Sequence, residues 1–258
     1  MMLYKRYFSI HIKSLMQYKL SFVLVTLGQF LAAFSTFLGV YFMFSRFNTV
    51  EGFTYEEVLI CFAAITMAFS LAELFGSGLL TLPRMLGNGE FDRILIRPCN
   101  AIFQVISAKM DFTRLGLFVQ AIIVLVYAIP KSGVIWTWDK ILTLFMMIIC
   151  GFLVFMCLCL LQASFSFFTV EGLEFMNILT YGGKEFGRYP YSIYGRDILR
   201  FLTYVIPLAL FQYYPLLYLL GIRQSKLYMF TPLISLFFSI PCYAFFRFGL
   251  RHYKSTGS

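Results

Sequence analysis

The sequence has few charged residues, and this scarcity decides the class of the protein. Asp, Glu, Lys and Arg make up 13% of the 258 residues, whereas hydrophobic residues make up 60% and the mean hydropathy is +0.80. In a soluble domain about a quarter of the residues are charged and about half are apolar. The composition therefore excludes an ordinary soluble domain and predicts one all-α membrane domain over residues 1–258.

Residue types common in catalytic and metal sites are also scarce. The two histidines, His11 and His252, lie near opposite ends of the sequence, and most of the six cysteines fall in apolar runs, where a thiol behaves as a small hydrophobe. The phosphate-loop pattern G-x-x-x-x-G-K-[ST] is absent, because GGKEFG at 182–187 has the wrong spacing. We expect no enzyme activity, no metal site, no disulfide and no cofactor bound by this chain.

Long apolar runs predict six membrane-spanning helices, since about 20 apolar residues suffice to cross the hydrocarbon layer. The expected spans cover about 20–44, 58–82, 102–129, 141–168, 199–220 and 227–248. Residues 1–19 mix aromatic and basic side chains, which predicts an interfacial helix. A signal peptide is disfavoured because the apolar run after residue 19 is longer than the roughly 7–15 residues of such a segment.

The basic residues indicate the orientation. With the N-terminus inside, 16 Lys and Arg residues fall on the inner side and 5 on the outer side, a bias typical of cytoplasmic loops. We expect both termini in the cytoplasm. The net charge of +9 is spread between apolar runs rather than gathered on one compact region, so the expected contact is lipid and not nucleic acid.

Residues 83–100 form the longest polar interruption in the first half of the sequence. Pro83 and Pro98 bound charged residues interleaved with Phe91, Ile94 and Leu95, which predicts a short amphipathic helix at the membrane surface. Apolar side chains that fill a cleft and charges that fix register are typical of a docking helix; a solvated, charged loop is the alternative. The candidate docking residues are Gly89, Glu90, Phe91, Asp92, Arg93, Ile94, Leu95, Arg97 and Pro98.

A second polar segment and a few intramembrane residues are further candidates. Residues 169–198 are expected as a second cytoplasmic segment, with Glu171, Arg188, Tyr189 and Pro190 as its candidate residues. Glu73 lies within the second span, where an acid marks either a transport pathway or a structural group hydrogen-bonded inside the bundle. Pro207 and Pro215 in the fifth span predict either a hinge in the pathway or ordinary kinks.

Three stretches of the sequence resemble one family of membrane permeases. GEFDRILIRPCNAIFQVISAKMDFTRLG at 89–116 has a Gly, an acid with large apolar neighbours, Arg-Pro, and an Asp before the third span. SFFTVEGLEF at 166–175 and GRYPYSIYGRDILRFLTYVIPLALFQYYPLLYLLG at 187–221 are similar to the aromatic-Thr-Val-acid, Tyr-Pro and Ile-Pro series of the same family. The family is that of the six-span permeases of the ABC type-2 exporter superfamily. The sequence departs from it at Phe168, where Trp is more usual.

The resemblance implies a transport complex. Such permeases act as dimers, of identical or homologous chains, with two copies of a separate subunit that binds ATP and Mg²⁺. The segment at 89–98 then corresponds to the coupling helix, and the expected location is the plasma membrane of a bacterium. Aromatic residues of the fifth and sixth spans, among them the pathway candidate Tyr214, suit export of a hydrophobic or amphipathic drug, peptide or lipid; a lipid-facing and helix-packing surface is the alternative. The alternatives are an immunity or sensor component that moves no cargo, and an ion-coupled carrier.

Overall fold

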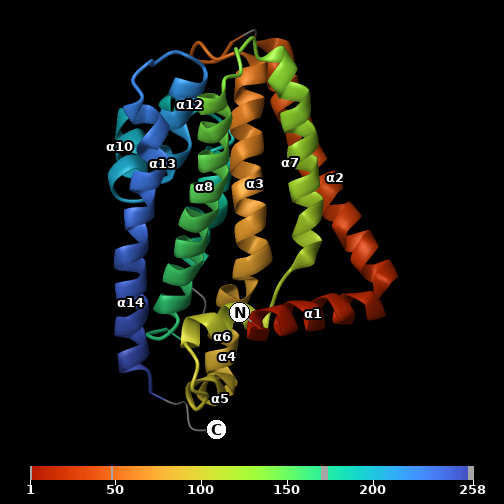
Figure 1. The fold of residues 1–258 in the computed structure, drawn as a ribbon, viewed down its shortest axis with the longest axis vertical. Coiled ribbons are helices and arrows are strands. Elements are labelled where there is room, and N and C mark those ends of the chain that lie inside the picture. Colours follow the sequence, from red (N-terminus) through yellow and green to blue (C-terminus); the bar gives the residue numbers. More distant parts are fainter. Residues whose placement is uncertain (1, 48, 170–173, 255–258) are drawn as a thin grey trace.

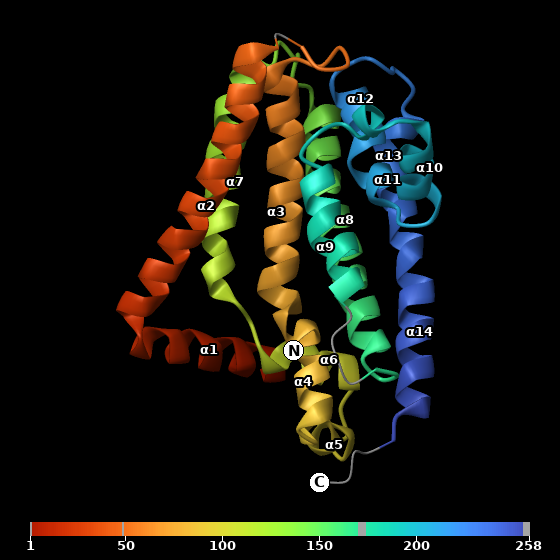
Figure 2. The same ribbon diagram turned by 180° about the vertical axis from the view of Figure 1, so that it is seen from behind.

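The computed structural model describes residues 2–47, 49–169 and 174–254, and in that part every named element is a helix. Figures 1 and 2 show an elongated bundle of long helices with short helices at both ends. Five helical segments are long and apolar enough to cross a membrane, or six if one bent pair is counted as a span. The predicted all-α membrane architecture is therefore confirmed.

The long helices lie over five of the expected spans. They are α2 (Lys19–Arg46), α3 (Tyr55–Leu80), α7 (Leu115–Ala128, followed by η2, Ile129–Lys131), α8 (Trp138–Phe165), and the run of α13 (Leu227–Ser235), η4 (Leu236–Phe238) and α14 (Ser239–His252). The interfacial helix expected at residues 1–19 is α1 (Met2–Gln17), which crosses the end of the bundle at a steep angle to α2 (Figure 1).

Helix α3 is the centre of the bundle. It packs against α7 on one side and α8 on the other, and it is buried over most of its length. Its first turn is fixed by a capping box in which the backbone N–H of Thr54 donates to Glu57 Oε2 at 2.8 Å. By contrast, only Ala33, Val40 and Phe44 are buried on α2, so α2 presents most of its apolar surface outward.

The third span begins later than the predicted residue 102. Residues 101–114 form α6 (Ala101–Ala108) and η1 (Phe112–Arg114), separated by extended backbone at Lys109. Asp111 stabilises this break, because its carboxylate accepts hydrogen bonds from the Thr113 backbone N–H at 3.2 Å and hydroxyl at 2.6 Å. Helix α6 instead packs on the end of α3, where a Cβ on Gly78 would lie 2.0 Å from the Val105 carbonyl oxygen.

The predicted fifth span at 199–220 is not a straight helix. It consists of α10 (Arg196–Tyr204), α11 (Leu208–Phe211) and α12 (Tyr213–Leu219), with a bend of 87° between α10 and the α11–α12 pair. Pro207 stands at the bend, where its ring removes a backbone donor. These helices lie at the end of the bundle away from α5 (Figures 1 and 2).

Helix α9 occupies part of the segment that was expected to lie in the cytoplasm. It covers Glu174–Phe186, is followed by η3 (Tyr191–Tyr194), and runs along α8 and α3 (Figure 2). The prediction that this whole segment lies outside the bundle is therefore wrong for α9. Met176, Thr180 and Gly183 form a buried stripe at helical spacing, and this stripe packs α9 along the bundle. Arg188, Arg196 and Arg200, which were counted as inner, lie toward the end of the bundle away from α5. Lys184 lies beside Phe69 in the middle of α3, so the count becomes 12 inner residues against 8 outer ones.

Candidate coupling surface and buried charge network

Two short helices project beyond α3 at one end of the bundle. They are α4 (Leu82–Gly87) and α5 (Glu90–Leu95), and α5 is at the tip (Figures 1 and 2). Gly89 joins them with φ +68°, a left-handed conformation that glycine adopts without steric cost. The amphipathic helix predicted between Pro83 and Pro98 is therefore present, although α4 precedes it.

Phe91 fastens α5 to the rest of the protein. Its side chain is fully buried, and its ring centroid lies 5.5 Å from that of Phe167 and 5.3 Å from that of Tyr253. The Tyr253 hydroxyl donates a hydrogen bond to Asp92 Oδ1 at 3.1 Å. Burial, together with this bond to a carboxylate, raises the pKa of Tyr253. Phe91 was expected to fill a cleft on a partner, but the structure places it inside this protein.

The exposed part of the tip comes directly after Phe91. Arg93, Leu95, Arg97 and Pro98 are exposed, and Ile96 is 84% exposed. The backbone around them is fixed from within, because the Gln104 side-chain amide donates to the carbonyl oxygens of Ile94 at 3.1 Å and Cys99 at 3.0 Å. We call residues 93–98 the coupling surface. Ile96 lies within the docking segment predicted from the sequence but is not among its candidate residues, although it is an apolar residue close to Arg93 and Arg97.

A buried charge network lies above this tip, beside the start of α7. Glu73 is 3% exposed, and its carboxylate pairs with Arg114 at 3.1 Å and accepts a hydrogen bond from the Tyr181 hydroxyl at 2.7 Å. Arg114 also pairs with Asp111 at 3.3 Å and donates to Gln29 Oε1 at 3.5 Å. The network therefore joins α2, α3, η1 and α9. These contacts fit the structural alternative for Glu73, and a role in transport stays a prediction.

The second candidate segment lies at the opposite end of α3. The Gly187 carbonyl accepts a hydrogen bond from the Gln212 side chain at 3.0 Å, and the Arg188 guanidinium lies 5.8 Å from the Phe62 ring centroid. Since Phe62 is near the start of α3, Arg188, Tyr189 and Pro190 are far from α5, and the common location expected for the two segments is wrong. Glu171 lies outside the described residues.

The remaining pathway candidates do not gather around Glu73. The Tyr214 hydroxyl lies 3.3 Å from Thr203 Oγ1, and its ring is 6.0 Å from that of Tyr228, so it links α12 with α10 and α13. Pro207 begins α11, and Pro215 is buried in α12. In the described part of the chain none of these three residues contacts Glu73. The structure thus separates the predicted pathway residues into two groups.

The arrangement of a membrane bundle with a projecting helical tip agrees with the sequence comparison. A model of the family described as ABC-2 family transporter protein matches residues 9–257. This chain belongs to the ABC-2 transporter family. The resemblance stated from the sequence is confirmed, and the match covers both the coupling surface and the charge network. Comparison with curated proteins and with solved structures found no match. ABC-2 membership makes the chain a membrane permease and implies association with an ATP-binding subunit.

Proposed function

We propose that the chain is the permease subunit of an ATP-driven exporter for a hydrophobic or amphipathic drug, peptide or lipid. Two copies of a separate subunit would bind ATP and Mg²⁺, and a second permease chain, identical or homologous, would complete the complex. The tip formed by α4 and α5 would face the cytoplasm of a bacterial cell, with the bundle in its plasma membrane. Family membership supports the permease role, and the coupling surface supports the ATPase partner.

The observation that carries the proposal is the exposure of Ile96 at the tip. An isoleucine with 84% of its surface in contact with solvent contributes nothing to the core of this chain. An apolar side chain surrounded by charged ones is the usual composition of the centre and rim of a protein–protein contact. Arg93 and Arg97 flank Ile96 and would fix its register against acidic groups of the ATPase.

The contacts of α5 support a route by which movement of the ATPase would reach the membrane helices. Phe91 connects α5 to Phe167, which follows α8, and to Tyr253, which follows α14. Through α4 the tip is also continuous with α3, and the buried charge network links α3 to α9 and to η1, which leads into α7. A displacement of α5 would therefore act on several membrane helices together, as alternating access requires.

Replacing Ile96 by Asp should weaken binding of the ATP-binding subunit. Loss of a central apolar contact typically costs about 2 kcal/mol, roughly a 30-fold loss of affinity, whereas stability should not change because the side chain is exposed. The measurement is copurification of the subunit from the native host in mild detergent, followed by permease-stimulated ATP hydrolysis.

Ile222 provides the matched control for this experiment. It is 55% exposed and follows α12 at the opposite end of the bundle, so Ile222→Asp should leave copurification intact. Equal binding of the subunit to the wild type and to Ile96→Asp would refute docking at this surface. Absence of any ATP-binding subunit from the wild-type complex would refute the exporter itself and favour the ion-coupled carrier.

A further inference from the structure

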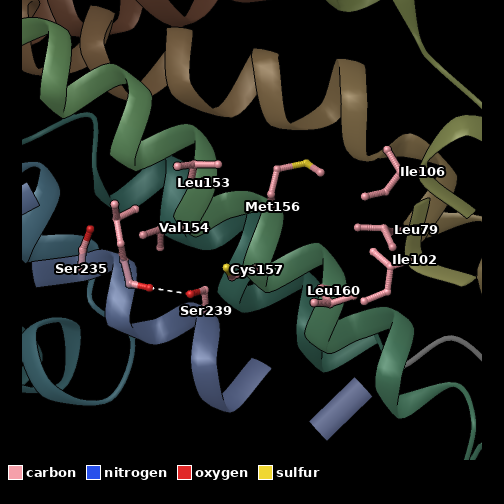
Figure 3. A pocket seen from close by; sticks show the side chains of 11 residues that line it. Leu79, Ile102, Ile106, Leu153, Val154, Met156, Cys157, Leu160, Ser235 and Ser239 are labelled. Atoms are coloured by element: carbon pink, nitrogen blue, oxygen red, sulfur yellow. Dashed lines mark hydrogen bonds between the residues drawn. The ribbon is translucent and has the colours of Figure 1, made fainter. Parts of the chain in front are cut away.

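A continuous apolar groove runs between α6, α8 and α14. Two cavities of about 340 Å³ and 980 Å³ share part of their lining. The shared residues are Ile102, Ile106, Cys157, Leu160 and Ser239. Figure 3 shows the inner cavity, with side chains of α6 and α8 facing residues near the start of α14. The two cavities therefore form one groove on the flank of the bundle.

The inner part of the groove suits hydrocarbon. Leu153 and Val154 line one end of this cavity and Leu79 lies beside Ile102 at the other (Figure 3). The two serine hydroxyls of the lining already donate hydrogen bonds to backbone carbonyl groups. Ser235 donates to the Pro232 carbonyl at 2.6 Å, and Ser239 donates to the Leu236 carbonyl at 2.7 Å. A ligand in this part needs no polar group, and the apolar side chains offer a lipid tail the same kind of packing contacts as the surrounding bilayer.

The other end of the groove is basic. A third cavity of about 240 Å³ shares Asn100, Ile102 and Tyr243 with the second and adds Arg247. The Arg247 guanidinium lies 6.0 Å from the Tyr243 ring centroid, and no carboxylate in the described part of the chain forms a salt bridge with it. Arg251 follows one turn later, in the last turn of α14. This end therefore favours an anion.

The length of the groove fits one lipid leaflet. On α13 to α14 its lining extends from Ser235 to Leu250, which at 1.5 Å per residue is roughly 22 Å. Half of the membrane hydrocarbon layer measures about 15 Å. A lipid whose acyl chain enters the groove from the end near α5 can therefore lie in it over the depth of one leaflet, with its headgroup at Arg247.

We propose that this groove binds one anionic phospholipid of the surrounding membrane. One acyl chain would lie along Ile102, Ile106 and Leu160, and the phosphate would contact Arg247. Basic pockets between membrane helices are known to favour anionic headgroups. The lipid would fill the gap between α6 and α14 and so support the base of the α5 tip. The proposal does not depend on export, because it concerns a resident lipid and not cargo.

The test is a lipid titration of the delipidated full-length complex, followed by native mass spectrometry. Phosphatidylglycerol and phosphatidylcholine with identical acyl chains serve as probes. The wild type should bind one phosphatidylglycerol per chain, about fivefold more tightly than phosphatidylcholine, since one basic residue near the surface gives an effect of this size. Arg247→Gln should abolish the preference, and Ile106→Trp should fill the groove and remove the bound lipid.

Two matched variants separate the groove from general lipid contact. Arg223→Gln removes an exposed basic residue at the other end of the bundle, and Val126→Trp enlarges an exposed apolar residue on α7; neither should change lipid binding. Ser239→Trp, at the exposed edge of the groove, replaces Ile106→Trp if that variant does not fold. Equal binding of both lipids to the wild type would overturn the proposal, and so would retention of the lipid in a folded groove-filling variant.

Discussion

Replacing Arg114 by Gln should destabilise the protein more than replacing its partner Glu73 by Gln. We expect a loss of about 3 kcal/mol or more in the first case, the usual cost of leaving a buried charge without its partner. At about 2–4 °C per kcal/mol for a chain of this size, the melting temperature would fall by roughly 6–12 °C. For Glu73→Gln we expect a loss of about 1 kcal/mol.

The asymmetry follows from what each variant leaves behind. Without Glu73, Arg114 still pairs with Asp111 at 3.3 Å, and its side chain is 24% exposed. A glutamine at position 73 can also accept the hydrogen bond from the Tyr181 hydroxyl. Without Arg114, the carboxylate of Glu73 stays buried with a neutral phenol as its hydrogen-bond partner. Burial of an unpaired charge is the costly case.

The measurement is a double-mutant cycle on the detergent-solubilised complex, followed by thermal unfolding. The variant that carries both glutamines should be more stable than Arg114→Gln alone, because it no longer holds the buried carboxylate of Glu73 without a cation. The matched control is the cycle for Asp197 and Arg200, whose side chains are 98% and 73% exposed and lie 3.6 Å apart. Its coupling energy should be about 0–1 kcal/mol. A similar value for Glu73 and Arg114 would show that the network does not hold α3 against α7.

The sequence predicts the elements whose signals are local. Pro83 and Pro98 bound the short helices of the tip, and the apolar runs of α2, α3 and α8 exceed the length needed for a span. Glu73 is also recognisable from the sequence, because an acid in such a run requires a partner. Its actual partners, Arg114 and Tyr181, come from residues 41 and 108 positions away, and no local pattern indicates such a distant pairing.

The parts that the sequence did not predict depend on tertiary contacts. The start of α7 shifts to Leu115 because Asp111 caps a break and α6 packs on Gly78 of α3. Helix α9 carries enough charge to suggest a loop, yet Lys184 stacks over the Phe69 ring at 4.8 Å and also pairs with Glu185. A charged residue with such contacts can lie along a bundle, and composition alone does not distinguish it from a solvated residue.

Replacing Phe91 by Ala should loosen the tip formed by α4 and α5 without removing the coupling surface. Truncation of a fully buried phenylalanine typically costs about 3–5 kcal/mol, and here it would leave a cavity between Phe167 and Tyr253. Part of this cost can appear as local opening of α5, since the tip contacts the bundle through few residues. The measurements are thermal unfolding of the complex and amide hydrogen exchange of residues 90–98.

The matched control is Phe237→Ala, because Phe237 is 69% exposed in η4 and should lose little packing. Phe91→Leu should recover most of the stability, since it retains an apolar side chain in the same cavity. Unchanged hydrogen exchange in Phe91→Ala would contradict the anchoring role.

Comparison with Ile96→Asp separates anchoring from docking. Ile96→Asp should weaken ATPase binding at constant stability, whereas Phe91→Ala should lower stability and reduce stimulated ATP hydrolysis more than subunit binding. This difference arises because a mobile tip can still contact the ATPase but transmits less of its movement to α8 and α14. In the proposed exporter, coupling would therefore require two apolar residues of the tip with opposite exposure, Ile96 turned toward the partner and Phe91 toward the bundle.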